Sequence, residues 1–462
     1  MRYLPHTDDE IRAMLERIGV GSVDDLFAPI PEELRAKPLQ LEPALSEPAL
    51  MAHLEALAAK NGATETLSFL GAGMYDHHVP PAVDQLLLRS EFYTAYTPYQ
   101  AEVSQGTLQA IFEFQTLVCQ LFGMEVANAS MYCAASGSAE AVLMARRVTK
   151  RGHVVVSGAL HPHYVDTIAT FLRGSDDGAP NMDVAEVTPE GLTDLASVEK
   201  LLRGATTADG EKRPKGEQTA CVVVGYPNFL GGLEDLEKLA ALAHEAGALL
   251  VTATAEPYAL SLVRPPGELG ADICVGEGQA LAVPPQLGGP GVGLFACRQK
   301  FVRQMPGRLV GQTVDQDGER GFVLTLSTRE QHIRRERATS NICTNHGLIA
   351  LAFAIRVAML GRKGFEQAGE SCLAGAEYLK KRIGELDGFE LPYGATTFNE
   401  FVVRRTEGLA APLLAALAAQ GILAGVDLGT FRPEWERDFL VAVTERHSKA
   451  DLDRLADALA SA

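Results

Sequence analysis

The sequence lacks the short motifs that mark several common classes of enzyme. No Walker lysine, G-x-S-x-G or H-E-x-x-H sequence occurs, so P-loop nucleotide binding and the common hydrolase chemistries have no motif to support them. No C-x-x-C pair occurs either, and the seven cysteines are odd in number and widely spaced. This argues against a disulfide framework or a structural zinc site, and it fits a reducing, cytoplasmic location.

Basic residues and long hydrophobic runs are also scarce. The chain has 41 Lys and Arg against 59 Asp and Glu, which gives a net charge of −18. A surface of this sign repels phosphate backbones and anionic lipids, so neither a nucleic acid nor a membrane is expected as a partner. The 408–426 stretch has no charged residue, but alanine dominates it and Pro412 and Gly421 interrupt it. Alanine contributes too little transfer energy for insertion, so we expect a helix in water there.

Short apolar runs alternate with helical periodicity in the middle of the chain. The runs Val154–Val156, Cys221–Val224 and Leu249–Val251 are typical of buried parallel strands. Between the last two, Leu233–Gly247 has apolar residues at helical spacing. A strand, a helix and a strand in this order predict a βαβ unit and therefore an α/β fold. Two further strands are predicted at 273–276 and 291–297.

Changes in residue composition and hydrophobic pattern along the chain predict three parts. A capping box at Thr7–Glu10 opens an N-terminal helix, and the proline-rich stretch Pro29–Pro48 predicts an extended arm. After about Thr328, a basic stretch expected to be helical, Arg329–Arg337, leads into a mixed α/β tail. We predict an N-terminal helix and arm at 1–63, a large domain at 64–330 and a small C-terminal domain at 331–462. The tail is expected to contain strands at 399–404 and 439–444 and helices at 348–360, 412–420 and 450–462.

Two segments of small residues are candidates for anion binding. Ala134–Glu140, with Ser136 and Gly137, precedes a helix predicted at 141–150. Small residues at a helix start expose backbone N–H groups to an anion, but for this segment alone a serine that simply caps the helix is the favoured explanation. Gly288–Gly293 lacks the preceding strand and following helix of a dinucleotide-binding loop.

A loop rich in tyrosine is a candidate for contact with a small substrate. Tyr93–Gln100 holds three of the eleven tyrosines, and Pro98 forbids a regular helix there. Tyrosine hydroxyls in a loop suit a small polar ligand, and packing in an interface or core is an equal alternative. His77 and His78 lie nearby in the sequence, but a lone histidine is more often structural than catalytic.

Several long segments together resemble one family, the P-protein of the glycine cleavage system. They are RYLPHTDDEIRAMLERIGV, LSFLGAGMYDHHVPPAVDQLLLRSEFYTAYTPYQAEVSQGTLQAIFEFQTLVCQLFGMEVANASMY, GADICVGEGQALAVPPQLGGPGVGLFACRQKFVRQMPGRLVGQT and LSTREQHIRRERATSNICTNHGLIAL. The family has a long single-chain form with two similar halves and a form split into two subunits. The opening RYLPHT and the length resemble subunit 1 of the split form.

The resemblance implies a fold and a cofactor chemistry. The fold is that of fold-type I transferases dependent on pyridoxal phosphate (PLP), as in aspartate aminotransferase. It comprises a large domain around a mixed, mostly parallel sheet and a smaller α/β C-terminal domain. The family's catalytic half carries a lysine that binds PLP as a Schiff base, ahead of a run ending Gly-Gly-Pro-Gly.

This sequence departs from the family's catalytic half at that lysine. Counting back from Gly288–Gly291 places Gln279 at the lysine position, and an amide cannot form a Schiff base. His161 resembles the histidine that stacks on the cofactor ring, and Ser136 and Gly137 match a degenerate phosphate site. Glu256 is the one weak candidate for the acid at the pyridine nitrogen. The resemblance therefore implies that this chain binds no cofactor covalently.

The resemblance also implies partners. Subunit 2 would hold the PLP in a heterotetramer of two plus two subunits, release CO2 from glycine and pass the aminomethyl group to the lipoyl arm of the H-protein. Tyr96, Tyr99 and His78 would reach the substrate region of subunit 2. Asn341, within Ser340–Thr344, would lie near the interface.

Two alternatives remain open at this point. The chain is a pure scaffold if it contributes no side chain to the chemistry. It is an independent PLP enzyme if another lysine, such as Lys300 or Lys150, forms the Schiff base.

Overall fold

The computed structural model describes residues 5–37, 39–62, 65–175, 178, 180–286, 289–342 and 344–461. The chain divides into two compact units, Met1–Thr64 and Glu65–Ala462. The first unit contains helices α1 (Asp8–Ile18) and α2 (Glu47–Ala58), joined by an irregular arm with two short 3-10 helices. The capping box predicted at Thr7 is confirmed: its side chain and that of Glu10 each accept from the other's backbone N–H.

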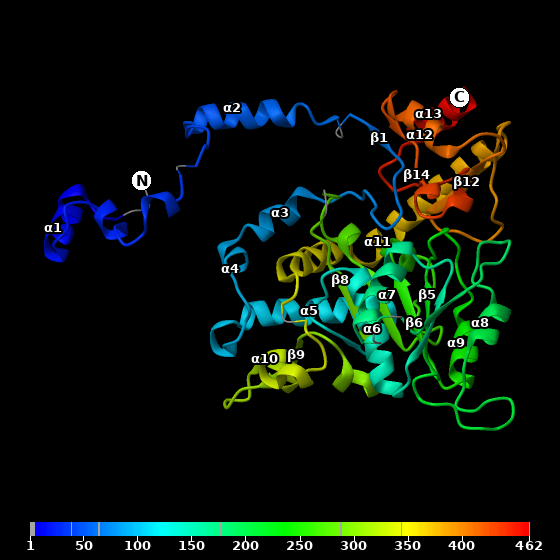
Figure 1. The fold of residues 1–462 in the computed structure, drawn as a ribbon. Helices are drawn as coiled ribbons and strands as arrows, with labels where there is room; N and C mark the ends of the chain where they lie inside the picture. Colours follow the sequence, from blue (N-terminus) through cyan, green and yellow to red (C-terminus); the bar gives the residue numbers. More distant parts are fainter. Residues whose placement is uncertain are drawn as a thin grey trace. The chain divides into compact units, whose positions relative to one another are not determined.

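A seven-stranded sheet forms the centre of the second unit (Figure 1). Its strand order is β2-β8-β7-β6-β5-β3-β4, and β8 alone runs antiparallel to both of its neighbours. The mostly parallel sheet that was predicted is thereby confirmed. The strands are β2 (Val126–Ala127), β3 (His153–Ser157), β4 (Met182–Ala185), β5 (Thr219–Gly225), β6 (Leu249–Thr254), β7 (Ile273–Glu277) and β8 (Gly293–Cys297).

Helices cover both faces of this sheet because its strands are apolar on both sides. Val222 and Val224 of β5 belong to one buried cluster, whereas Val223 belongs to the other, as the two-residue period of a strand requires. Helices α5, α9 and α11 pack on the first face, and α6 and α7 pack on the second. Their bounds are α5 (Gln105–Phe122), α6 (Ala134–Thr149), α7 (Pro162–Ser175), α9 (Leu236–Glu245) and α11 (Gly347–Gly384), and the shorter helices are α3 (Pro81–Leu87), α4 (Ser90–Tyr93) and α8 (Leu195–Leu201).

A second, antiparallel sheet lies in the C-terminal part of the chain, with strand order β11-β12-β15-β14. It packs with the end of α11 and with α12 and α13 around a core of its own. Strand β1 (Leu67–Ser68) pairs with β13 (Ile422–Leu423), so the start of the second unit lies beside this C-terminal part. The remaining bounds are β11 (Phe389–Glu390), β12 (Glu400–Arg405), α12 (Ala410–Ala418), β14 (Val426–Asp427), β15 (Asp438–Ala442) and α13 (Lys449–Ala460).

One expectation about local structure was wrong, and two predicted helices are present but longer than expected. The stretch Arg329–Arg337 is not one helix: it contains a 3-10 turn, the single helical turn α10 (Gln331–Arg334) and a second 3-10 turn, because Arg335 adopts φ 54°. The helix expected to begin near 141 is α6, which already begins at Ala134. The helix expected at 348–360 continues as α11 to Gly384, across a kink at Gly361.

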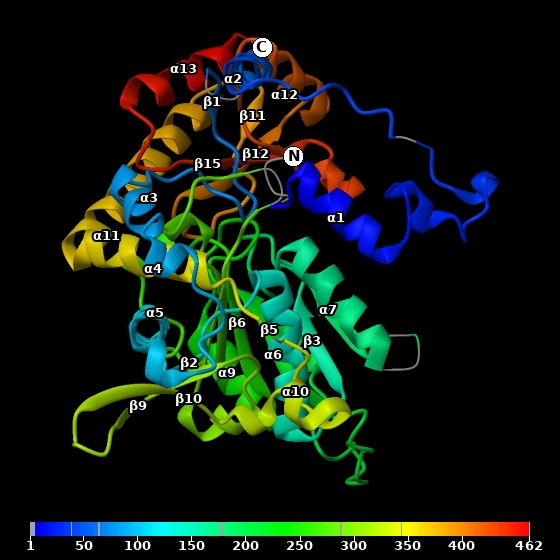
Figure 2. The same cartoon turned by 90° about the vertical axis from the view of Figure 1, so that its left-hand side faces the viewer.

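A β-hairpin that the sequence did not indicate lies between the two sheets in the chain order. It consists of β9 (Leu309–Val314) and β10 (Arg320–Thr325), which pair with each other and, among the described residues, with no other strand. Figure 2 shows it extending away from the central sheet. Within the described residues, no helix is long and apolar enough to cross a membrane. The boundary predicted near 330 between a large and a small domain stays a prediction.

Candidate functional site

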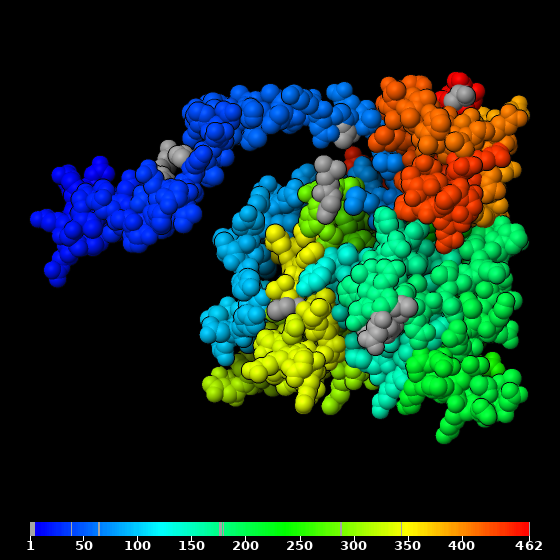
Figure 3. Space-filling view, viewed as in Figure 1, coloured from blue at the N-terminus to red at the C-terminus, as the bar shows by residue number. Residues whose placement is uncertain are grey.

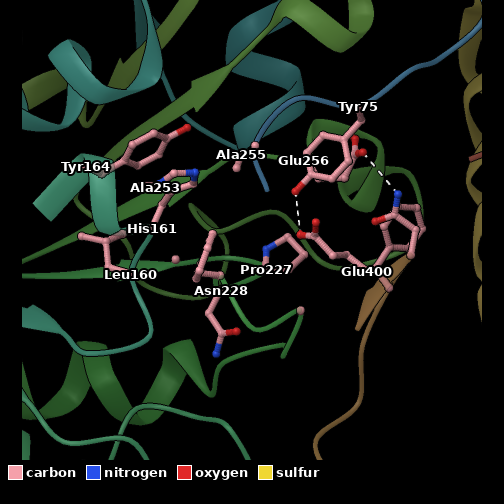
Figure 4. Close-up of a pocket in the computed structure, with 16 residues that line it drawn as sticks. Tyr75, Leu160, His161, Tyr164, Pro227, Asn228, Ala253, Ala255, Glu256 and Glu400 are labelled. Carbon is pink, nitrogen blue, oxygen red and sulfur yellow. Dashed lines mark hydrogen bonds between the residues drawn. The ribbon is translucent and has the colours of Figure 1, made fainter. Parts of the chain in front are cut away.

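Polar side chains gather where the parallel strands of the central sheet end. His161 follows β3, Asn228 follows β5, Glu256 follows β6, and Gln279 follows β7. In open α/β sheets, ligands bind at the carboxyl ends of the strands. This edge of the sheet is therefore the candidate functional site, and Figure 4 shows the side chains that line its central cavity.

His161 is held as a neutral ring. Its Nε2 lies 2.9 Å from the carbonyl oxygen of Ala72, and its Nδ1 accepts from the N–H of His163 at 3.2 Å. Burial lowers the pKa of His161 to about 4, against the raising effect of the Ala72 carbonyl. One face of the ring stacks on Tyr164 at a centroid distance of 4.7 Å. The face-to-face partner of this histidine is therefore a side chain of the same protein.

The cavity beside His161 is almost filled. Its volume is about 20 Å³, which is room for about one water molecule. Glu400 takes part of the space: one carboxylate oxygen accepts from the N–H of Ala72 at 2.6 Å, and the other accepts from the Tyr75 hydroxyl at 2.8 Å. Burial raises the pKa of Glu400 to about 8, although these two donors lower it. The space beside His161 is thus shared with a buried carboxylate of the same chain.

Glu256 is engaged by a buried histidine. His77 Nε2 lies 3.0 Å from a Glu256 carboxylate oxygen, and His77 Nδ1 lies 2.6 Å from Glu445. Burial alone would lower the pKa of His77, but the two carboxylates raise it to about 9. The imidazolium stacks on Tyr258 at a centroid distance of 3.9 Å. Glu256, the weak candidate for a cofactor acid, is thus already paired with a cation of the same chain.

Gln279 is buried in the short 3-10 helix η6 (Gln279–Leu281) and turned toward its own loop. Its side-chain amide donates to the carbonyl oxygen of Val283. Its backbone N–H donates to Glu277 at 3.1 Å. Gly288, which helped to place Gln279 in the sequence comparison, lies outside the described residues.

The start of α6 differs from the anion site that was predicted. Cys133 is the N-cap, and Ser136 sits in the first turn, where its hydroxyl and the Cys133 thiol complete a capping box. Gly137 allows close packing on β7, since a Cβ there would lie 2.7 Å from Val275. The N–H of Ala134 donates to Glu277 at 3.1 Å. Ser136 and Gly137 therefore shape the helix start, and a carboxylate of this chain already binds there.

The tyrosine loop and its predicted companions lie on the surface, and none of them lines this cavity. Tyr96 is 77% exposed and Tyr99 is 58% exposed. His78 and Asn341 are also exposed. Tyr96 lines a surface hollow of about 190 Å³ together with Thr344 and Asn345. Figure 3 shows the 90–105 segment beside the chain that leads into α11. Cys343, part of the expected interface segment, lies outside the described residues.

Arg308 anchors the tyrosine loop and was missed in the sequence. Its guanidinium donates to the Thr97 hydroxyl at 3.1 Å and to the Tyr99 hydroxyl at 3.3 Å. Glu330, also buried, lies 3.4 Å from Arg308 Nε. Tyr75, Glu400 and Glu277 were missed as well, because their partners are distant in sequence.

The sheet topology is that of fold-type I, the fold class of many PLP-dependent enzymes. Two solved structures share the fold: a NifS-like protein from Rickettsia africae, with TM-score 0.61, 13% identity and 86% of this chain and 99% of that chain covered, and a sphingosine-1-phosphate lyase from Burkholderia pseudomallei, with TM-score 0.62, 14% identity and 93% of each chain covered.

The family model described as "Glycine cleavage system P-protein" matches residues 1–459, and the chain belongs to this family. It is 58% identical to a Sorangium cellulosum protein named probable glycine dehydrogenase (decarboxylating) subunit 1, over 100% of this chain and 99% of that protein. A protein of the same name from Desulforamulus reducens is 48% identical over 99% and 98%. A crystal structure of glycine decarboxylase (P-protein) in an inhibitor-bound form superposes with TM-score 0.87, at 42% identity, over 100% of both chains.

Proposed function

We propose that this chain is the non-catalytic subunit of a two-subunit glycine decarboxylase, and that the PLP is held by its partner, subunit 2. The observation that carries the proposal is the state of Gln279: a buried amide, bonded within its own loop, follows the strand that would present the lysine. PLP needs an amine for attachment and supplies the electron sink for the loss of CO2 from glycine. An amide offers no such amine.

The two alternative lysines have poor positions for this role. Lys300 follows β8, which is antiparallel, so it lies at the opposite edge of the sheet from the parallel strands' carboxyl ends. Its ammonium lies 3.9 Å from Asp272 and over the ring of Phe301. Lys150 is the C-cap of α6, at the far end of that helix from Ala134. Both positions favour a partner that carries the cofactor over an independent PLP enzyme.

The exposed loop is the part of this chain that we propose to reach the partner's substrate region. Tyr96 and Tyr99 are exposed side chains, and buried Arg308 donates to the hydroxyl of Tyr99. His78 has its backbone fixed at both ends, since its N–H donates to Glu445 and its carbonyl accepts from Arg356. We place Asn341 at the same interface. Glycine and the lipoyl arm of the H-protein would meet subunit 2's cofactor there.

Co-expression with subunit 2 tests this proposal. The purified chain alone should be colourless with added PLP and inactive in glycine–bicarbonate exchange, and the co-purified complex should be yellow and active. Reduction with borohydride followed by peptide mapping should find PLP only on a subunit 2 peptide. A PLP-labelled peptide from this chain would contradict the proposal.

A second experiment separates a contributing subunit from a pure scaffold. The Tyr96→Phe and Tyr99→Phe variants remove one hydroxyl each and leave the rings in place. We expect exchange activity to fall while the complex still co-purifies. Unchanged activity in both variants, and in the double variant, would favour the scaffold.

A further inference from the structure

Three backbone N–H groups from separate segments converge on the carboxylate of Glu277. Ala134, the first residue of α6, donates to one oxygen at 3.1 Å. Gln279 in η6 and Val292 just before β8 donate to the other oxygen at 3.1 and 2.9 Å. A convergent set of backbone donors at a helix start is the usual protein site for phosphate and other anions.

The electrostatics of this place favour a negative charge. Helix α6 has 16 residues, and its first turn contains no acidic side chain. Glu277 therefore supplies the anion that the partial positive charge of the helix start attracts. The pKa of Glu277 is nevertheless raised from its ordinary value, because burial outweighs the lowering effect of the donors Val292, Ala134 and Gln279 and of His346. These groups hold the carboxylate in place without an arginine or lysine among its hydrogen-bond donors.

The surrounding backbone leaves little space for a second anion. Glu277 is the last residue of β7 and pairs in register with Gly293 of β8. A Cβ at Gly291 would lie 3.1 Å from the Glu277 carboxylate, and one at Gly278 would lie 2.8 Å from Val292. The carboxylate thus sits in a close-fitting cradle formed by η6, the start of β8 and the start of α6.

We infer that Glu277 is an internal anion that occupies the phosphate-binding position of this chain's degenerate cofactor site. A phosphate ester would need the N–H groups that Glu277 already uses, so the two are mutually exclusive. Side chains of this chain now fill both charged positions of the lost site. Glu277 takes the place of the phosphate, and the His77 imidazolium faces the Glu256 carboxylate. The inference rests in part on the proposed absence of PLP from this chain, but its test needs neither subunit 2 nor glycine.

The test is whether removal of the carboxylate opens the cradle to inorganic phosphate. Thermal unfolding of the full chain is followed in phosphate and in chloride at equal ionic strength. The wild type should have the same Tm in both salts. Glu277→Ala should be less stable in chloride and should show a saturable, phosphate-specific rise in Tm of about 2 °C or more. Glu277→Gln, which refills the cradle with a neutral amide, should show a smaller rise or none.

Glu234→Ala is the matched control. Glu234 is a buried carboxylate that accepts from the N–H and hydroxyl of Thr193 and from Asn228, away from the start of α6. It should lose stability without gaining a phosphate response. An equal response in Glu234→Ala, or a folded Glu277→Ala without any response, overturns the inference.

A crystallographic measurement covers the case in which Glu277→Ala does not fold. Wild-type crystals soaked in phosphate should keep the Glu277 carboxylate on the N–H of Ala134, with no phosphate bound there. A phosphate on Ala134, with Glu277 displaced, would overturn the inference independently of any variant. Because PLP attachment and exchange activity enter neither measurement, a failure of the proposed function would be recognised separately.

Discussion

At the scale of single residues, His77 is the most heavily coupled group near the site. It lies between Glu256 and Glu445 and is almost completely buried. His77→Gln would leave the buried carboxylate of Glu256 and the half-buried carboxylate of Glu445 without their shared cation. We expect a loss of about 3–5 kcal/mol in the free energy of unfolding, the cost of breaking a buried ion pair. Urea unfolding at pH 7 measures this, with His53→Gln, an exposed histidine of α2, as the control.

The same pair predicts a pH dependence with a definite sign. The pKa of His77 is raised from 6.5 to about 9 in the folded chain, so its stabilisation is complete below about 6.5 and is lost as the pH rises through 9. The pKa of Glu445 is lowered to about 2, despite burial, by His77; its contribution is present above 4.5 and is lost as the pH falls toward 2. The stability difference between wild type and His77→Gln should therefore shrink between pH 7 and pH 10. Parallel curves over this range would contradict the assignment.

Restoring the lysine alone should not restore the cofactor. In Gln279→Lys the amine returns, but the cavity still holds only about 20 Å³, and Glu277 still uses the N–H of Ala134. We expect no PLP to be trapped by borohydride on this variant, with subunit 2 as the positive control. A labelled peptide that contains position 279 would show that the lysine was the only missing element.

At this scale, the sequence predicted the role of a residue only where that role depends on neighbours in the sequence. Gln279 was identified because its position follows from a nearby glycine run. Glu277, two residues away, was not recognised, because its partners Ala134 and Val292 come from other segments and its meaning exists only in the folded chain. His77 was noticed but left without a role for the same reason: Glu256 and Glu445 lie far along the chain.

At the scale of elements, the position of the tyrosine loop depends on hydrogen bonds from Arg308. Arg308→Lys keeps a cation beside Glu330 but loses the fork that reaches both Thr97 and Tyr99. These charged hydrogen bonds lie within the chain, so their loss should lower its free energy of unfolding by about 1.5–3 kcal/mol. Because the loop then loses its fixed position, we expect the exchange activity of the assembled complex to fall about tenfold. Urea unfolding measures the first effect, and kcat/KM for glycine, assayed where the variant is fully folded, measures the second.

Arg320→Lys provides the matched control for Arg308→Lys. Arg320 lies on the hairpin that Arg308 immediately precedes, and it is stacked over Phe322 rather than bonded to the loop. It should leave exchange activity unchanged. Equal losses in both variants would assign the effect to the hairpin as a whole, and no loss in Arg308→Lys would remove the anchor role.

Elements were predictable from sequence where one physical signal dominated. The buried strands β3, β5 and β6 were found because they are apolar on both faces. The hairpin was not, because β9 turns from buried at Leu309 to exposed at Val314 and carries no continuous apolar pattern. The basic stretch failed as a helix because the left-handed backbone at Arg335, a tertiary feature, divides it.

At the scale of the whole molecule, the 88–103 segment of the second unit exposes an unusual number of large apolar side chains. Leu88, Tyr93, Tyr96 and Val103 are all large and exposed, and they lie within one short segment around α4 and the tyrosine loop. Clustered apolar exposure of this kind marks a protein–protein interface. The proposed assembly with subunit 2 would bury it. The resemblance already implied that Tyr96 and Tyr99 reach subunit 2, whereas the exposure of Leu88 and Val103 beside them is seen only in the structure.

The interface assignment predicts a variant that folds but does not assemble. Val103 is 80% exposed, so Val103→Asp should leave the thermal stability of the isolated chain within about 0.5 kcal/mol of the wild type. In the complex it would bury an unpaired carboxylate, which costs several kcal/mol and should weaken assembly by a factor of about 100 or more. Co-purification and sedimentation with subunit 2 measure the loss.

The control for this variant is Val184→Asp on β4, the edge strand at the other end of the central sheet. Val184 is 47% exposed, so the same substitution introduces the same charge on a surface that we do not assign to the interface. It should assemble like the wild type. If Val103→Asp assembles equally well, the partner does not cover this segment, and the tyrosines next to it cannot reach the partner's substrate.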